Sequence, residues 1–281
     1  IKGRNETRVV RDIGQLIVPP AEILAIRGAT HLQLLRETTN ASWNNAIPFL
    51  GPRPQPDYSL GFKREAFTRE RRKTLQPFIG KDLDDCSRFA ATYDMYFPFL
   101  TCEVKCGASA LDIADRQNAH SRTVLLQGLF MLYKIVGREK ELHGKINGFS
   151  ISHSDVDVRI WGHLIIIEGN NPHYYREPIA KFDITKTAQA DNRWTAWVVV
   201  MNILDLWVPD HFKDICSIID EVSDSFKTLS DADLSQSGVS QPPDEEDHEQ
   251  VITNNEHVGQ PITPETTIQS HSSSPKRNKR Q

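Results

Sequence analysis

The most informative stretch of the sequence runs from Met95 to Lys105 and reads MYFPFLTCEVK. It is rich in aromatic and apolar residues, which is typical of a buried β-strand. Successive side chains of a strand point to opposite faces, so Thr101, Glu103 and Lys105 share one face and the other face is apolar. A charged pair in an apolar strand is costly unless it serves a site. We therefore expect this strand to offer Glu103 and Lys105 to a cleft.

A further carboxylate, Asp57, follows a proline and begins another predicted strand, residues 57–62. Two carboxylates can hold Mg²⁺ or Mn²⁺, and an ammonium group beside them can activate water or stabilise developing charge. Asp57, Glu103 and Lys105 therefore form the candidate catalytic set. The structural alternatives are a turn-forming aspartate at position 57 and an exposed ion pair between Glu103 and Lys105.

The flanking sequence alternates between helical and strand patterns, which is typical of an α/β domain around a short mixed sheet. Helices are expected over residues 21–38, within a polar insertion at 63–92, and over 108–136, 194–206 and 210–222, the last two separated by Pro209. Further strands are expected over residues 145–151, 156–167 and 174–184.

Composition excludes several classes of protein. No apolar run approaches the roughly 20 residues that span a bilayer, so no membrane partner is expected. The four cysteines are too few for a disulfide scaffold at 281 residues, and their spacing fits no zinc pattern. Together these observations favour a reduced, intracellular protein.

The C-terminal segment differs from the rest of the chain. From Asp231 onward it holds nine acidic and four basic residues, a net charge of −5, which leaves the remainder at +1. Such a polar segment cannot bury enough apolar surface to fold. We divide the chain into an N-terminal arm (1–22), a domain (23–227) and a disordered acidic tail (228–281). The basic end at 274–280 indicates a nuclear location as one alternative.

Several longer segments resemble the PD-(D/E)xK superfamily, which has the restriction-endonuclease-like fold, and within it an uncharacterised fungal branch. They are PDYSLGF (56–62), YFPFLTCEVKCG (96–107), DRQNAH (115–120), FSISH (149–153) and WVPDHF (207–212). The resemblance covers about residues 24–222. It implies a restriction-endonuclease-like mixed sheet flanked by helices.

The resemblance also implies roles for the candidate set. Asp57 and Glu103 would be the metal ligands, and the backbone carbonyl of Val104 a further ligand. Lys105 would orient or deprotonate the attacking water or stabilise the charge of the transition state. The implied activity is that of a Mg²⁺- or Mn²⁺-dependent nuclease that hydrolyses phosphodiester bonds, with DNA favoured over RNA.

Two further residues match less defined features of that superfamily, and four others are candidates because of their own charge or chemistry. Gln117 fits the place of a helical glutamine after the Glu-x-Lys strand, and Glu37 that of an acidic residue on the first helix. Arg71, Arg72 and Lys73 are candidates for nucleic-acid backbone contacts, with solvated surface as the alternative. His120 is a candidate for a contact to the phosphate, with an ordinary helix histidine as the alternative.

Two other functions fit the same sequence. The chain could be a catalytically silent nuclease-like protein that binds nucleic acid without cleaving it. It could also be a protein-interaction module whose acidic tail recruits a basic partner. A homodimer is a further expectation from the resemblance, and the sequence favours no particular interface.

Overall fold

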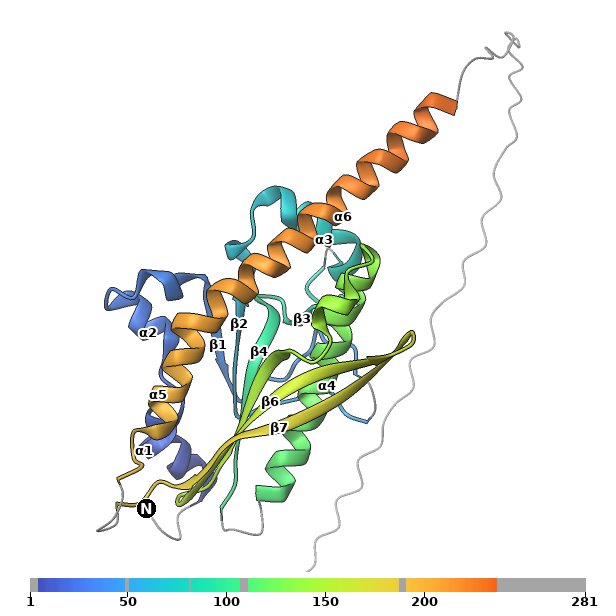
Figure 1. Cartoon of the computed structure of the whole chain (residues 1–281). Coiled ribbons are helices and arrows are strands. Elements are labelled where there is room, and N and C mark those ends of the chain that lie inside the picture. The colour runs from blue at the N-terminus through green and yellow to red at the C-terminus, as the bar shows by residue number, and fades with distance from the viewer. Residues whose placement is uncertain (1–4, 49–50, 81, 107–110, 187–190, 237–281) are drawn as a thin grey trace, which may run out of the picture. The chain divides into compact units, whose positions relative to one another are not determined.

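The computed structural model of the chain describes residues 5–48, 51–80, 82–106, 111–186 and 191–236, with side chains described as far as residue 223. Within these ranges a mixed seven-stranded sheet is flanked by helices (Figure 1), which confirms the predicted α/β class. No helix of these ranges is long and apolar enough to cross a membrane. The predicted disorder of the tail beyond residue 236 falls outside the described residues.

The sheet has the order β1-β2-β4-β5-β6-β7, and β3 pairs with β4. The neighbours β4 and β5 are parallel, and all other pairs are antiparallel. The strands are β1 (Leu35–Thr39), β2 (Tyr58–Lys63), β3 (Ala90–Thr92), β4 (Met95–Val104), β5 (Ile146–His153), β6 (Asp157–Glu168) and β7 (Asn171–Asp183). The strands predicted from the sequence are thus all present, and β1 and β3 are additional.

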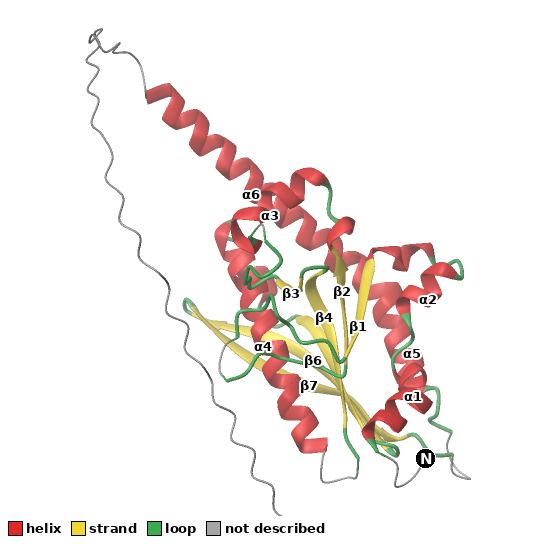
Figure 2. Ribbon diagram, turned by 180° about the vertical axis from the view of Figure 1, so that it is seen from behind, coloured by secondary structure: helices red, strands yellow, loops and turns green. Residues whose placement is uncertain are grey.

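Helices cover both faces of the central strands (Figures 1 and 2). They are α1 (Glu6–Ile17), α2 (Ala21–Ile26), α3 (Arg69–Ile79), α4 (Leu111–Ile135), α5 (Thr195–Asn202) and α6 (Val208–Gln236). Helix α4 makes the crossover between the parallel strands β4 and β5, a connection that parallel pairing requires. It packs on the face of β2 that carries Ser59, whereas α6 packs on the face that carries Phe62.

The face toward α6 is apolar. Leu60, Phe62 and Leu100 are fully buried there, and the ring of Phe62 lies 4.8 Å from that of Phe212 on α6. Burial of large apolar side chains of this kind stabilises a fold by about 1.5–3 kcal/mol each. This face therefore holds the main core of the domain.

The face toward α4 is polar and is held by hydrogen bonds. Asn118 of α4 accepts a hydrogen bond from Thr101 of β4 and donates to the carbonyl of Ile151 and to Ser152 of β5. The buried guanidinium of Arg122 donates to two further backbone carbonyls. These bonds tie α4 to β4 and β5 together and so fix the ends of both strands.

Burial along β4 differs from the prediction in one respect. Every residue from Met95 to Val104 is buried, so the Glu103 face is covered by α4 and does not lie open to a cleft. Access is instead from the end of the strand, where Lys105 follows Val104. The expectation failed because alternation reports which face a residue lies on but not what covers that face.

The predicted helix over residues 21–38 is wrong in its second half. Helix α2 ends at Ile26, because Gly28 adopts a positive φ of 114°. After one 3₁₀ turn the chain enters β1, so Glu37 lies on a strand and not on the first helix. The segment predicted as an N-terminal arm (1–22) contains the helix α1, which buries Val9, Ile13 and Ile17.

Helices α5 and α6 form one continuous run, although Pro209 was expected to separate them. A π-helical turn at Ile203–Trp207 joins them, and the N–H of Val208 bonds to the carbonyl of Ile203. Proline lacks an N–H and disfavours the regular α-helical ladder, and a π-turn is one way to accommodate it. Helix α6 continues to Gln236, past the predicted domain boundary at residue 227.

Candidate active site

Asp57 lies directly before β2, at the end of the sheet where β4 also ends. Its Oδ2 atom accepts a hydrogen bond of 2.8 Å from the backbone N–H of Val104. Since Tyr58 pairs with Cys102 in the antiparallel ladder, the next position places Asp57 opposite Glu103. The register therefore brings together two carboxylates that are 46 positions apart in sequence.

Glu103 is the more deeply buried of the two carboxylates, with 3% of its surface exposed. Burial, and next the negative charge of Asp57, raise the pKa of Glu103 to about 8. A hydrogen bond between the two carboxyl groups acts in the same direction, and the charge of Lys105 opposes them. At neutral pH the carboxyl pair therefore holds a proton that one cation in the right place would displace.

Lys105 places its ammonium group among these carboxylates. Its Nζ atom lies 3.9 Å from Glu103 Oε2 and 4.0 Å from Asp57 Oδ2. It donates a hydrogen bond of 2.9 Å to the carbonyl oxygen of Val104. Only 16% of the Lys105 side chain is exposed, so its charge is screened by water less than that of a surface lysine.

A third carboxylate, Glu6, reaches the same ammonium from α1. Its Oε2 atom lies 3.9 Å from Lys105 Nζ, and 48% of the Glu6 side chain is exposed. Helix α1 is held in this position by the packing of Val9 and Ile13 against Val104. Glu6, and not Glu37, is therefore the acidic residue of the first helix that lies next to this ammonium.

His153 is the last residue of β5, beside Val104 in the parallel ladder. Its carbonyl accepts a hydrogen bond from the N–H of Lys105, and its Nδ1 atom is 3.0 Å from the carbonyl oxygen of Ser154. Burial lowers the pKa of the imidazole. The neutral, buried imidazole ring of His153 therefore lies beside the carboxylates. The sequence alone did not predict this position.

A cavity of about 270 Å³ opens beside Asp57, between α1 and the sheet. Arg11 and Gln15 line it from α1, and Tyr58 and Glu37 from the strands. The Tyr58 hydroxyl donates a 2.7 Å hydrogen bond to Glu37, while burial, followed by the charge of Glu37, raises the pKa of the phenol. The cavity gives Asp57 a side that a ligand can approach.

One family model matches the chain, and it covers residues 1–219. Its description is Domain of unknown function (DUF7924). The chain belongs to this family. No curated protein and no solved structure matches the chain significantly. The match includes α1, the helix that carries Glu6.

Among the described residues no contact links Gln117, His120 or the basic residues of α3 to Asp57, Glu103 and Lys105, here called the Lys105 cluster. Gln117 is exposed on α4, and its neighbour Asn118 is the residue that faces the sheet. The Nε2 atom of His120 is 3.3 Å from the carbonyl oxygen of Pro52. Arg71 is bound to Asp220 of α6 by two hydrogen bonds of 2.8 and 2.7 Å.

The donor atoms at the site suit a hard divalent cation. Carboxylate and carbonyl oxygens are the ligands that Mg²⁺ and Mn²⁺ prefer, and Asp57, Glu103 and the Val104 carbonyl supply them. In the described part of the chain no three His, Cys, Asp or Glu side chains are grouped to hold a metal. A cation here would thus rely on two carboxylates, one carbonyl and water, which is a common set for Mg²⁺.

Proposed function

We propose that this protein hydrolyses phosphodiester bonds in nucleic acid, with DNA favoured over RNA, and depends on Mg²⁺ or Mn²⁺. The observation that carries the proposal is the position of Lys105, whose ammonium group lies within 4.0 Å of both Asp57 and Glu103. An ammonium next to two carboxylates at the open end of a sheet is the set of groups that metal-dependent hydrolysis of a phosphodiester needs. The proposal includes a restriction-endonuclease-like fold for the domain.

Three features of the domain support that fold. The aspartate precedes β2, the Glu-x-Lys sequence lies at the end of the adjacent strand β4, and the helix α4 is the next described element. These features stand where the resemblance to the PD-(D/E)xK superfamily implies them. The acidic residue on the first helix is then Glu6.

Asp57, Glu103 and the carbonyl of Val104 would hold the cation. When bound, it would polarise the phosphate and lower the pKa of a water molecule, which generates the nucleophile at neutral pH. Asp57 is already oriented for this role, because its second oxygen is fixed by the N–H of Val104. A fixed ligand avoids the entropy cost of ordering a side chain when the site fills.

Lys105 would act on the water and on the charge of the phosphate. Its ammonium group now donates to the Val104 carbonyl, and rotation of the lysine side chain would free both groups. The freed ammonium could hold the attacking water by a hydrogen bond or neutralise the oxygens of the transition state. Removal of such a group lowers rates by about 10²–10⁴-fold.

One observation favours a second candidate function, a nuclease-like protein that binds nucleic acid without cleaving it. The Lys105 ammonium lies near three carboxylates and donates to the Val104 carbonyl, where a metal would also bind. If this arrangement were permanent, the ammonium would replace the metal. The protein would then keep the fold and the charges of a nuclease but lack the reaction.

A cleavage assay separates the two candidates. Purified protein is incubated with linear DNA, circular DNA and RNA, each with Mg²⁺ or Mn²⁺. Asp57→Asn and Glu103→Gln, both confirmed as folded by circular dichroism, are assayed beside it. Cleavage that both substitutions abolish supports the nuclease. Absence of cleavage on every substrate with either metal contradicts it and favours the binding protein.

A further inference from the structure

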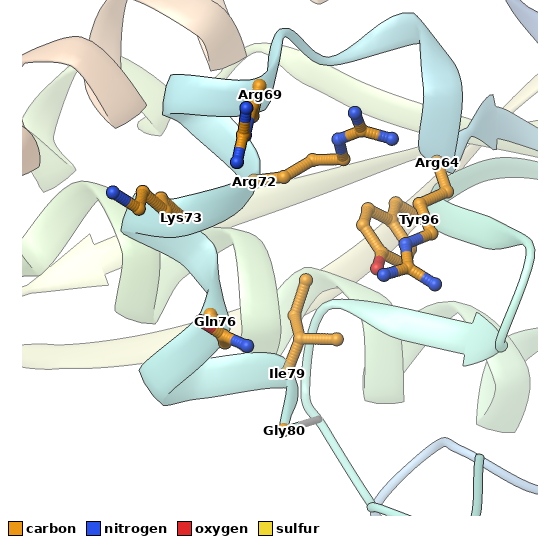
Figure 3. Close-up of a pocket in the computed structure, with 8 residues that line it drawn as sticks. All are labelled: Arg64, Arg69, Arg72, Lys73, Gln76, Ile79, Gly80 and Tyr96. Atoms are coloured by element: carbon orange, nitrogen blue, oxygen red, sulfur yellow. The ribbon is translucent and has the colours of Figure 1, made fainter. Parts of the chain in front are cut away.

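A second polar cavity, of about 300 Å³, lies between α3 and the beginning of β4. Figure 3 shows the side chains that line it, with Arg69, Arg72 and Lys73 from α3 and Arg64 and Tyr96 from the opposite wall. Ile79 adds an apolar contact at the end of the helix. Four cationic groups thus surround one small space.

This cavity is remote from the candidate active site. Tyr96 stands near the start of β4 and Glu103 near its end, seven residues further along the same strand. At about 3.3 Å per residue, the two ends of this segment are separated by roughly 20 Å. A ligand of the cavity is therefore not a ligand of the Lys105 cluster.

The positive charges of the cavity are only partly balanced by the protein. A hydrogen bond from its own backbone lowers the pKa of the neighbouring Glu70, and the charges of Arg69 and Lys73 help to lower it. None of the ion pairs among the described residues involves Arg64, Arg69, Arg72 or Lys73, and no described acidic residue lines the cavity. The buried Nε atom of Arg64 has no hydrogen-bond partner in the described part of the chain. The described fold itself therefore leaves one donor of this guanidinium unsatisfied, which is uncommon for a buried polar atom.

Arg64 is held in place by an aromatic ring and not by a counter-ion. Its guanidinium carbon lies 4.4 Å from the centre of the Tyr93 ring. Stacking of this kind orients the planar guanidinium and leaves its N–H groups available to a ligand. The contrast is Arg71 on the same helix α3, which is fully occupied by Asp220.

We propose that this cavity binds closely spaced phosphate groups. Four cationic side chains that line one cavity and form no ion pair among the described residues repel one another, and a bound anion reduces this repulsion. Three of the four are arginines, whose planar donors bind phosphate oxygens in pairs. The volume exceeds what one phosphate needs and suits two or three linked phosphates.

Such phosphates can come from a free polyphosphate or nucleotide, or from consecutive positions of a nucleic-acid backbone. In the second case the cavity would hold the strand roughly 20 Å from the Lys105 cluster, a span of about six base pairs of DNA. This binding site stands independently of the proposed hydrolysis, since it would serve a silent binding protein equally well.

The test is calorimetric titration of the full chain with tripolyphosphate at about 0.15 M salt and without divalent metal. Without a divalent metal the carboxyl pair of Asp57 and Glu103 keeps a net negative charge that repels an anion, so binding reports the cavity. We expect saturable binding of one equivalent. Arg72→Gln should weaken it about tenfold or more, because it removes hydrogen bonds between charged groups.

Arg71→Gln is the matched control, since it removes the same charge from the adjacent position of α3. Its side chain is bound to Asp220, so tripolyphosphate affinity should stay within about twofold of wild type. Circular dichroism confirms that both variants are folded. Absence of saturable binding, or equal weakening by Arg71→Gln and Arg72→Gln, would overturn the proposal, because a diffuse positive surface responds to both changes alike.

Competition with a 20-base-pair DNA duplex identifies the source of the phosphates. If the duplex displaces tripolyphosphate and itself binds more weakly to Arg72→Gln, the cavity holds a nucleic-acid backbone. If tripolyphosphate binds and the duplex does not displace it, the ligand is a free polyphosphate or nucleotide. Either result supports a phosphate site, and neither depends on cleavage.

Discussion

Asp57 Oδ2 and the backbone nitrogen of Val104 are joined by a 2.8 Å hydrogen bond at the end of the sheet. This bond fixes one carboxylate against the strand that carries the other, and it leaves both next to Lys105. The charge distribution that results is the basis of the proposed chemistry. It also yields predictions that need no substrate.

The first prediction concerns the proton on the carboxylate pair. In Asp57→Asn we expect the pKa of Glu103 to fall from about 8 by about one unit or more, because the negative charge of Asp57 is lost while burial remains. The measurement is a carbon-detected NMR titration of the glutamate carboxyl group without metal. A pKa that stays at the wild-type value would show that the two carboxylates do not interact.

The second prediction compares two glycines in helices. In Gly128→Ala the new Cβ would lie 2.0 Å from the backbone carbonyl oxygen of Arg88, so α4 must shift and stability should fall by about 1–3 kcal/mol or more. In Gly14→Ala of α1 the nearest atom is 3.7 Å away, and alanine should stabilise the helix by about 1 kcal/mol. Urea unfolding measures both. Changes of the same sign would contradict the packing of α4.

The third prediction concerns two adjacent residues of α4. Asn118→Ala removes three buried hydrogen bonds to β4 and β5, so we expect a loss of about 2–4 kcal/mol in the free energy of unfolding. Gln117→Ala changes an exposed side chain and should alter it by less than about 0.5 kcal/mol. Equal losses of stability in the two variants would contradict the orientation of α4 in which Asn118, and not Gln117, faces the sheet.

The fourth prediction concerns acid. Burial lowers the pKa of His211 to about 3, so the folded state keeps this histidine neutral where the unfolded chain, with a pKa near 6.5, binds a proton. Stability that is present above pH 6.5 is therefore lost as the pH falls toward 3. Proton binding to His211 in the unfolded chain therefore lowers the free energy of unfolding by about 2 kcal/mol between pH 7 and pH 5.

His211→Phe is the variant that tests this origin. It keeps an aromatic ring over Trp207, which His211 contacts at a centroid distance of 4.1 Å, and removes the titrating group. Thermal unfolding of wild type and variant from pH 7 to pH 5 should show a flatter dependence in the variant. Parallel curves would assign the acid sensitivity to other groups, among them the buried His163.

The sequence was informative where a pattern is local. Alternation along β4 placed Glu103 and Lys105 on one face, and the proline before Asp57 marked the start of β2. A two-residue spacing keeps its geometry in any strand, so this part of the site follows from sequence alone. The pairing of Asp57 with Glu103 needed in addition the register of two strands.

Other parts of the site depend on packing between distant segments. Glu6 reaches Lys105 only because Val9 and Ile13 pack on Val104, and no local signal reports that contact. Glu37 was assigned to a helix because apolar residues from 23 to 35 happen to recur at helical spacing. Pairing with β2 outweighed that pattern, as tertiary context commonly does.

The basic run on α3 shows a third limit. Arg71 and Arg72 are equivalent in composition, but they lie about 100° apart around the helix. One side chain meets Asp220 and the other enters the cavity beside Tyr96. Sequence predicted the cluster of charge, and the phase of the helix relative to α6 decided which residues remain available.

The most direct test of the central claim is the rate of metal-dependent cleavage by Lys105→Ala, compared with wild type and with Lys140→Ala, an exposed lysine outside the site. The assay uses supercoiled plasmid DNA, excess enzyme and Mn²⁺, so that the rate reports a single turnover. We expect Lys105→Ala to lose about 10²–10⁴-fold in rate while Lys140→Ala keeps the wild-type rate. Equal rates in all three proteins would contradict it, as would the absence of cleavage by the wild type.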